Sequence, residues 1–372
     1  RAGSSTTLDC DGGGAESWRA PSGVNVPSYI STFCGRFYMN VTPTYGTAST
    51  DPAWMYPLDG DRYAVGTSTD RKGGDIWTAD AAIAVMENEP DWDGMLVSLP
   101  SIDKMAHMWG TDDTGPSGVG DDTFDFAHLP EVARIADEQV GRLIAALEDQ
   151  EIREETLVVL TTDHAGQTAD RFHGVNEPGR SNFNWYFGQD ADEAYLDPAP
   201  DLAPLVPGNS NVDFTYQDGH IAVFLDDTSV PAMKQAATDV LELPDVIAAY
   251  YREGDRYLRH GPLGAMSGRE FSWWRRHAQT LLDTMAADYG PDVVGLMRDD
   301  TSYGVMGDHG GHQRAIQEIP IVFNWPGLEA GARPGSRIRS VDITPTVLRL
   351  MGIEPDPTHP MDGTAVRLPL SG

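Results

Sequence analysis

The sequence carries little positive charge. Its 372 residues contain 26 Lys and Arg but 57 Asp and Glu, which gives a formal net charge of −31 and a pI of about 4.4. Such an acidic chain lacks the basic surface that contacts with phosphates require, so we expect no binding to nucleic-acid duplexes. An anionic substrate would need local positive charge, which bound metal ions could supply.

Long apolar runs and cysteines are also scarce. No stretch reaches the roughly 18 apolar residues of a transmembrane helix, so we expect no membrane span. The chain has two cysteines, Cys10 and Cys34, in one Gly/Ser/Pro-rich segment. A disulfide between them would fit an extracytoplasmic protein, and we expect a secreted, periplasmic or cell-surface location. Two buried free thiols are the alternative.

Composition divides the chain near residue 75. Residues 1–75 are rich in Gly, Ser, Thr and Pro, which predicts an irregular, cap-like N-terminal segment. Residues 76–372 are expected to form the core, with an insertion at about 175–300. Thr344 is expected to cap the last helix and Gly352 to end it. Periodicity predicts helices at 77–86, 130–147, 231–241, 246–251, 272–287 and 342–352, and strands at 93–99, 156–160, 218–225 and 319–323.

Two of the predicted strands each lead into an Asp and a His. The apolar run at 156–160 suits a strand buried on both faces, as in a parallel sheet, and Asp163 and His164 follow it. The strand at 93–99 leads to Asp103 and His107, whose spacing puts both on one face of a helical turn. The helix between the two strands makes a right-handed crossover, which brings both pairs to one sheet edge.

A third segment offers His309, with His312 nearby, in a Gly-rich loop before the strand at 319–323. Mixed Asp and His side chains select zinc or a similar metal, since calcium and magnesium prefer oxygen ligands. The five candidate ligands are too many for one tetrahedral zinc and suit two metals, an arrangement well adapted to phosphoryl transfer. The alternative is that each pair only caps a loop, and that His312 either supports the site or is a surface residue.

These segments resemble motifs of the alkaline phosphatase superfamily. Residues 161–166 (TTDHAG) are similar to its T/S-D-H-G motif, with Ala165 in a position that the family usually gives to Gly. Residues 103–107 (DKMAH) resemble the D-x-x-x-H motif of the nucleotide pyrophosphatase/phosphodiesterase (type I phosphodiesterase) branch. Residues 307–311 (GDHGG), 341–346 (VDITPT) and 362–363 resemble its later segments. The resemblance runs from about 75 to 365, with 175–300 unmatched.

The resemblance implies a fold and a ligand set. The fold would be α/β, a three-layer α/β/α sandwich with a mostly parallel central sheet, and residues 76–372 would be an alkaline-phosphatase-like catalytic core. Carried over residue by residue, Asp103, His107 and His309 would bind one zinc ion. Asp163 and His164 would bind the second, with other divalent metals as an alternative to zinc.

One expected part of the family pattern has no match in residues 1–100. Family members have an early strand ending in a metal-binding Asp, followed by a Thr or Ser nucleophile at a helix N-terminus. No catalytic residue is therefore assigned, and we expect the nucleophile upstream of Arg1, on an N-terminal portion of the same protein.

The predicted function is hydrolysis of a small phosphoester through a covalent phospho-enzyme. A diester is preferred to a monoester because no obvious basic pocket is present, although Arg171 and Arg314 could supply part of one. Two alternatives are a sulfatase or a phosphotransferase of the same superfamily, although the sulfatase motif C-x-P-S-R is absent. A third is a non-catalytic, metal-stabilised binding protein.

Overall fold

The chain divides into two compact units, one formed by Arg1–Leu143 and Gly166–Gln317 and the other by Ile144–Ala165 and Glu318–Gly372. The computed structural model describes residues 9–10, 18–19, 74–100, 102–103, 106, 128–167, 171–173, 211–217, 219–303, 309–334 and 337–370. The predicted disulfide and most of the cap-like segment at 1–75 lie outside these residues, as does His107.

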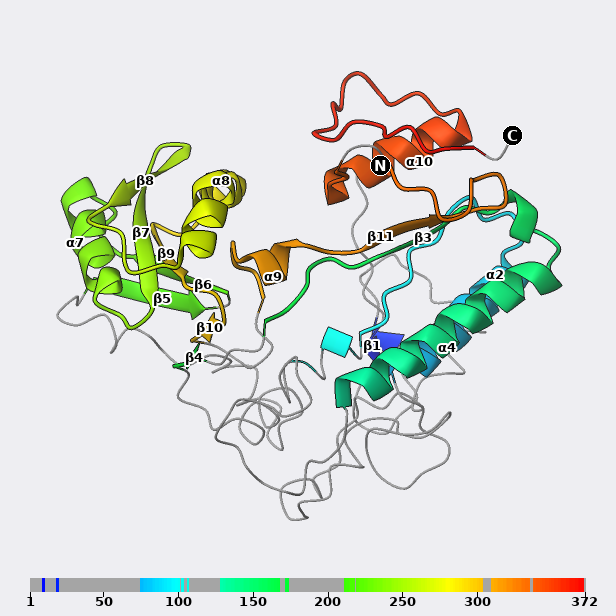
Figure 1. Ribbon diagram of the computed structural model, residues 1–372, viewed down its shortest axis with the longest axis horizontal. Helices are drawn as coiled ribbons and strands as arrows, with labels where there is room; N and C mark the ends of the chain where they lie inside the picture. The colour runs from blue at the N-terminus through cyan, green and yellow to red at the C-terminus, as the bar shows by residue number, and fades with distance from the viewer. Residues whose placement is uncertain are drawn as a thin grey trace, which may run out of the picture. The chain divides into compact units, whose positions relative to one another are not determined.

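The first unit contains a five-stranded sheet in the order β5-β6-β9-β7-β8 (Figure 1). Every neighbouring pair in it is antiparallel. Because β6 and β7 run in the same direction on either side of β9, helix α7 joins them as a split β-α-β unit. The strands are β5 (Val212–Gln217), β6 (His220–Leu225), β7 (Val246–Glu253), β8 (Arg256–His260) and β9 (Val293–Met297), and the helix is α7 (Val230–Leu241).

Two helices cover opposite faces of this sheet (Figure 1). Helix α7 packs its Ala236 and Val240 against Ile221 and Val293, and these belong to one buried apolar cluster. Helix α8 (Gly268–Met285) places Leu282 in a second cluster on the other face. Side chains alternate between the faces along each strand, so a strand covered by helices on both sides must be apolar throughout.

Strand β7 corrects one prediction. Residues 246–251 were expected to form a helix, and they form the strand Val246–Glu253 instead. A short apolar run fits a buried strand as well as a helix. Here β8 and β9 pair with it on both sides, and the successive residues Ala249 and Tyr250 belong to the clusters on opposite faces. Tertiary pairing therefore decides the conformation of this segment.

Helix α8 begins at a capping box. The hydroxyl of Ser267 accepts a hydrogen bond from the backbone nitrogen of Glu270, and the Glu270 carboxylate accepts one from the nitrogen of Ser267. This reciprocal pair satisfies two backbone donors that a helix start leaves without partners. Burial alone would raise the pKa of Glu270, but hydrogen bonds from Ser267 and Asp299 and the charge of Arg298 hold it below its usual value.

Two further strand pairs belong to the first unit. Strands β1 (Asp9–Cys10) and β2 (Trp18–Arg19) are antiparallel. Strands β4 (Arg171–Phe172) and β10 (Thr301–Ser302) are parallel. The buried side chain of Gln167 reinforces the second pair, since its Nε2 donates to the Thr301 carbonyl at 2.7 Å.

Helices α2 (Gly74–Asn88) and α4 (His128–Asp149) confirm the predictions at 77–86 and 130–147. The Arg142 guanidinium lies 2.5 Å from the Asp80 carboxylate and links the two helices. The strand predicted at 93–99 is wrong, because these residues are described and carry no strand or helix. The side chain of Leu96 is 98% exposed, so the apolar residues of this segment do not indicate a buried strand.

The second unit contains the predicted strands at 156–160 and 319–323 as β3 (Val158–Thr161) and β11 (Ile321–Asn324). They pair antiparallel, with Thr161 opposite Ile321. Leu160 is 47% exposed, so the expectation of burial on both faces is wrong for β3. An antiparallel pair can leave one face to solvent, which accounts for the difference.

Helix α10 (Ile343–Met351) confirms the prediction at 342–352. Gly352 ends it with φ of +69°, a left-handed conformation that glycine adopts without strain. Thr344 was expected to be the N-cap, and this is wrong, because the helix begins one residue earlier and follows the 3-10 turn η6 (Ser340–Asp342). Asp342 stands at the junction of the two.

The α/β class is confirmed by these helices and sheets. A mostly parallel central sheet is not seen among the described strands, where parallel pairing occurs between β4 and β10. The boundary predicted near residue 75 and the insertion at 175–300 stay predictions. Within the described residues, no helix combines the length and apolar character needed to cross a membrane.

Candidate metal centre

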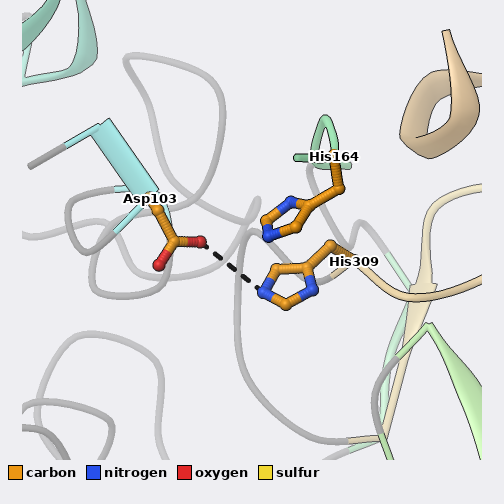
Figure 2. Close-up of side chains that lie close together, drawn as sticks. All are labelled: Asp103, His164 and His309. Atoms are coloured by element: carbon orange, nitrogen blue, oxygen red, sulfur yellow. Dashed lines mark ion pairs between the residues drawn. The ribbon is translucent and has the colours of Figure 1, made fainter. Parts of the chain in front are cut away.

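Asp103 and His309 meet although they are far apart in the sequence. The Nε2 atom of His309 lies 3.5 Å from Oδ1 of Asp103, and both side chains are partly buried (Figure 2). Asp103 lies on a short helical segment with Ile102, and His309 precedes the loop that leads to α9 (Arg314–Gln317). A carboxylate and an imidazole that face each other at this separation can share a cation as ligands.

The glycine after His309 makes a sharp turn. Gly310 has φ of +77°, which L-residues with side chains rarely adopt. The turn directs His312 into the protein, where it is 3% exposed and its Nδ1 atom has no hydrogen-bond partner. Burial lowers the pKa of His312 to about 4. The alternative that His312 is a surface residue is therefore wrong.

Asp163 and His164 follow β3 in the second unit, at the strand end where they were predicted. The backbone nitrogen of His164 donates to Oδ1 of Asp163 at 3.1 Å, and its Nε2 lies 3.5 Å from Oδ2. The Asp163 side chain is 88% exposed, whereas that of His164 is partly buried. Asp163 thus caps its own turn, and its carboxylate is open to an added ligand.

Within the first unit, Asp103 and His309 form a pair of side chains that could share a metal ion, and His164 of the second unit offers a further imidazole (Figure 2). One carboxylate oxygen and two imidazole nitrogens make up this donor set. That chemistry suits zinc and other borderline divalent metals better than calcium or magnesium. Asp163 is not in this group, and the division of the five predicted ligands between two metals stays a prediction.

The two arginines considered for a substrate clamp have other neighbours. Arg171 donates to the Asp299 carbonyl at 2.8 Å and lies 3.8 Å from the Asp245 carboxylate. Arg314 lies over the ring of Trp273, with 5.9 Å between the guanidinium carbon and the ring centroid. Both guanidinium groups therefore already interact with other groups of the protein, which leaves less of their charge for a substrate.

Sequence reasoning missed the residues that hold the His309 loop in place. Gly219 and His220 contact it from the start of β6, and Trp273 contacts it from α8. All three lie within the segment at 175–300, for which no motif was recognised. A local sequence pattern cannot predict these contacts, because each of them joins residues that are far apart in the chain.

An Asp/His donor set of this kind suits a divalent metal ion that polarises a substrate oxygen or activates a water molecule. The model of the type I phosphodiesterase / nucleotide pyrophosphatase family matches residues 17–197. This match covers slightly less than half of the 372 residues and confirms the predicted resemblance to a family of phosphoric ester hydrolases. It includes Asp103 and His164, whereas His309 lies beyond its end. No curated protein matches the chain.

Proposed function

We propose that this protein is a two-zinc phosphodiesterase or nucleotide pyrophosphatase that acts on a small phosphoester outside the cytoplasm. The observation that carries the proposal is the approach of Asp103 to His309, since two motif residues from distant segments meet with ligand atoms 3.5 Å apart. The family match supports the reaction class. Other divalent metals remain an alternative to zinc.

In this proposal Asp103, His107 and His309 hold one ion, and Asp163 and His164 hold the other. The buried side chain of Gln167 makes two hydrogen bonds within the first unit. Its Nε2 donates to the carbonyl of Thr301 at 2.7 Å, and its Oε1 accepts from the nitrogen of Asp300 at 3.0 Å.

The chain's own residues then have defined tasks. The carboxylates of Asp103 and Asp163 bring negative charge, and the three imidazoles bind in their neutral form. Zinc bound there would supply Lewis acidity toward the phosphoryl group and lower the pKa of a water molecule. The nucleophile is a Thr or Ser hydroxyl expected upstream of Arg1, which attacks phosphorus and releases the leaving alcohol.

The proposal includes the finer features of the family fold. These are a three-layer α/β/α sandwich with a mostly parallel central sheet and a catalytic core at 76–372. An extracytoplasmic location and a Cys10–Cys34 disulfide belong to it as well. Thiol counting on the intact, unreduced protein tests the disulfide, and two reactive thiols in the unfolded chain would contradict it.

Substrate preference tests the reaction. The full-length protein is assayed with matched nitrophenyl esters: a phosphodiester, a phosphomonoester and a sulfate ester. We expect the diester to be hydrolysed fastest, the activity to disappear with a chelator, and zinc to restore it. Sulfate-ester hydrolysis without diesterase activity would identify a sulfatase instead, and zinc binding without turnover of any ester would identify a binding protein.

A further inference from the structure

The segment after His309 is held through its backbone carbonyl groups. Four successive carbonyls, those of residues 309–312, each accept a hydrogen bond from a different donor. The donors are the Gly219 nitrogen for His309, the His220 Nδ1 at 3.0 Å for Gly310, the Gln317 Nε2 at 2.6 Å for Gly311 and the Trp273 Nε1 at 2.6 Å for His312. Such a segment has little freedom to move.

Two of these donors are neighbours where β6 begins: Gly219 directly precedes the strand and His220 is its first residue, and we call this pair the 219–220 turn. It binds the carbonyl of His309 itself and that of Gly310, so it fixes the peptide groups on the C-terminal side of this ligand. A hydrogen bond also runs in the opposite direction, since Nε2 of Gln313 donates to the Gly219 carbonyl at 3.1 Å. The turn and the loop are therefore bonded in both directions.

The approach is close enough to require glycine. A Cβ atom added to Gly219 would collide with the His309 carbonyl oxygen and lie 2.5 Å from the nitrogen of Gly311. Both obstacles are backbone atoms, which cannot rotate away as the end of a flexible side chain can. His220 itself is buried, so its ring is held by packing as well as by its bond to Gly310.

We propose that the 219–220 turn positions His309 for metal binding and that His220 is the positioning residue. His220 is not a ligand in this scheme. Its Nδ1–H donates to the Gly310 carbonyl and thereby holds the backbone next to the ligand. The inference rests on the proposed function, and it links the five-stranded sheet to metal binding, because β6 of that sheet begins at His220.

The geometry predicts a specific pattern of substitutions. The amide nitrogen of Asn corresponds to Nδ1 of His, whereas that of Gln corresponds to Nε2. His220→Asn should therefore keep the bond to Gly310, and His220→Gln should lose it. Residues that orient metal ligands typically contribute about 10–100-fold in affinity, so His220→Gln should weaken zinc binding at least about 10-fold.

The experiment measures the zinc dissociation constant of the full-length chain by competition with a chromophoric chelator. It compares wild type, His220→Asn, His220→Gln and His309→Ala, and records the unfolding of each metal-free protein. His260→Gln is the matched control, because His260 lies on β8 of the same sheet and bonds to the Thr238 hydroxyl instead. We expect Asn to bind nearly as wild type, Gln to bind at least about 10-fold more weakly, and the control to be unchanged.

The remaining outcomes distinguish a failure of the positioning role of His220 from a failure of the proposed zinc-dependent function. If His309→Ala loses zinc but His220→Gln binds as wild type, the positioning role is wrong and the proposed function stands. Equal weakening in His220→Asn and His220→Gln, or in His260→Gln, would also overturn it, because the position of the donor would then not matter. If wild type binds zinc no better than His309→Ala, the proposed function fails and the inference with it.

Discussion

The indole nitrogen of Trp273 donates a 2.6 Å hydrogen bond to the carbonyl oxygen of His312 in the interior of the first unit. His312 is buried, and burial lowers the pKa of its imidazole to about 4, whereas the charge of Glu270 acts in the opposite direction. The neighbouring His220 and His277 lower it further. His312 is thus neutral when the protein is folded at neutral pH.

A pH dependence of stability follows from this pKa. The unfolded chain binds a proton at His312 near pH 6.5, whereas the folded chain does so only near pH 4. Stability should therefore fall as the pH drops from 6.5 to 4, by up to about 1.4 kcal/mol per pH unit from this group. His312→Phe should remove that component, as measured by urea unfolding with chelator present. His359→Phe, at an exposed position, should follow wild type, and a parallel slope for His312→Phe would contradict the prediction.

Asp342 should stabilise the second unit down to low pH. Its carboxylate accepts hydrogen bonds from the Arg339 side chain and from the backbone nitrogens of Thr364 and Arg339. These bonds, that of the Arg339 side chain first, lower its pKa to about 2 from 3.8. The stabilisation is therefore complete above pH 4 and is lost as the pH falls toward 2.

Asp342→Asn should then lower the free energy of unfolding by about 1 kcal/mol or more at pH 7, because hydrogen bonds to a charged group are lost. The difference from wild type should shrink between pH 4 and pH 2. Denaturant titrations across this range measure it. Asp288→Asn, at an exposed position in the first unit, is the control and should have little effect. A constant difference between Asp342→Asn and wild type would rule out the assigned role.

Two leucines provide a matched test of the fold. Leu282 is fully buried on the α8 face of the sheet, whereas Leu96 is 98% exposed in the segment that was predicted to be a strand. Leu282→Ala should cost about 2–5 kcal/mol through lost burial and a residual cavity. Leu96→Ala should change stability by less than about 0.5 kcal/mol. Similar costs at the two positions would mean that residues 93–99 are buried after all.

Zinc stoichiometry tests the division of ligands between two ions. Wild type should hold two zinc ions per chain, and Asp163→Asn and Asp103→Asn should each lower the count toward one, because each removes a charged ligand from a different ion. Native mass spectrometry at matched free zinc gives the counts, with Asp288→Asn as the control. A single ion in wild type, lost in both variants, would favour one shared site.

The sequence predicted helices better than sheet pairing. Helices α4 and α8 were recognised because their apolar positions recur with helical spacing, which is a local signal. The run at 246–251 carries no such signal, since all six of its residues are buried. Pairing of β7 with β9 depends on residues about 45 positions later, and no local pattern reports it.

The candidate site was predicted from motifs, and its supports were not. Asp103 and His309 were named because ligand-type residues stood beside predicted strands and in recognisable motifs. Gly219 and His220 carry no motif, and their contacts with residues 309–311 depend on the folded sheet. Metal-ligand residues can thus be recognised from the sequence by their side-chain chemistry. The residues that position them cannot, because those contacts depend on packing between distant parts of the chain.

The four carbonyl bonds of residues 309–312 have a consequence for the order of folding. Two of their donors, Gly219 and His220, lie at the start of β6 and one lies on α8, and the fourth, Gln317, comes from α9 just after the loop. The loop can take up its final shape only after the sheet and α8 have come together, and contacts between distant residues form late. During refolding, zinc should therefore bind more slowly than the sheet forms. The rate of zinc binding, followed with a metal-sensitive dye, would then report the rate at which the first unit assembles.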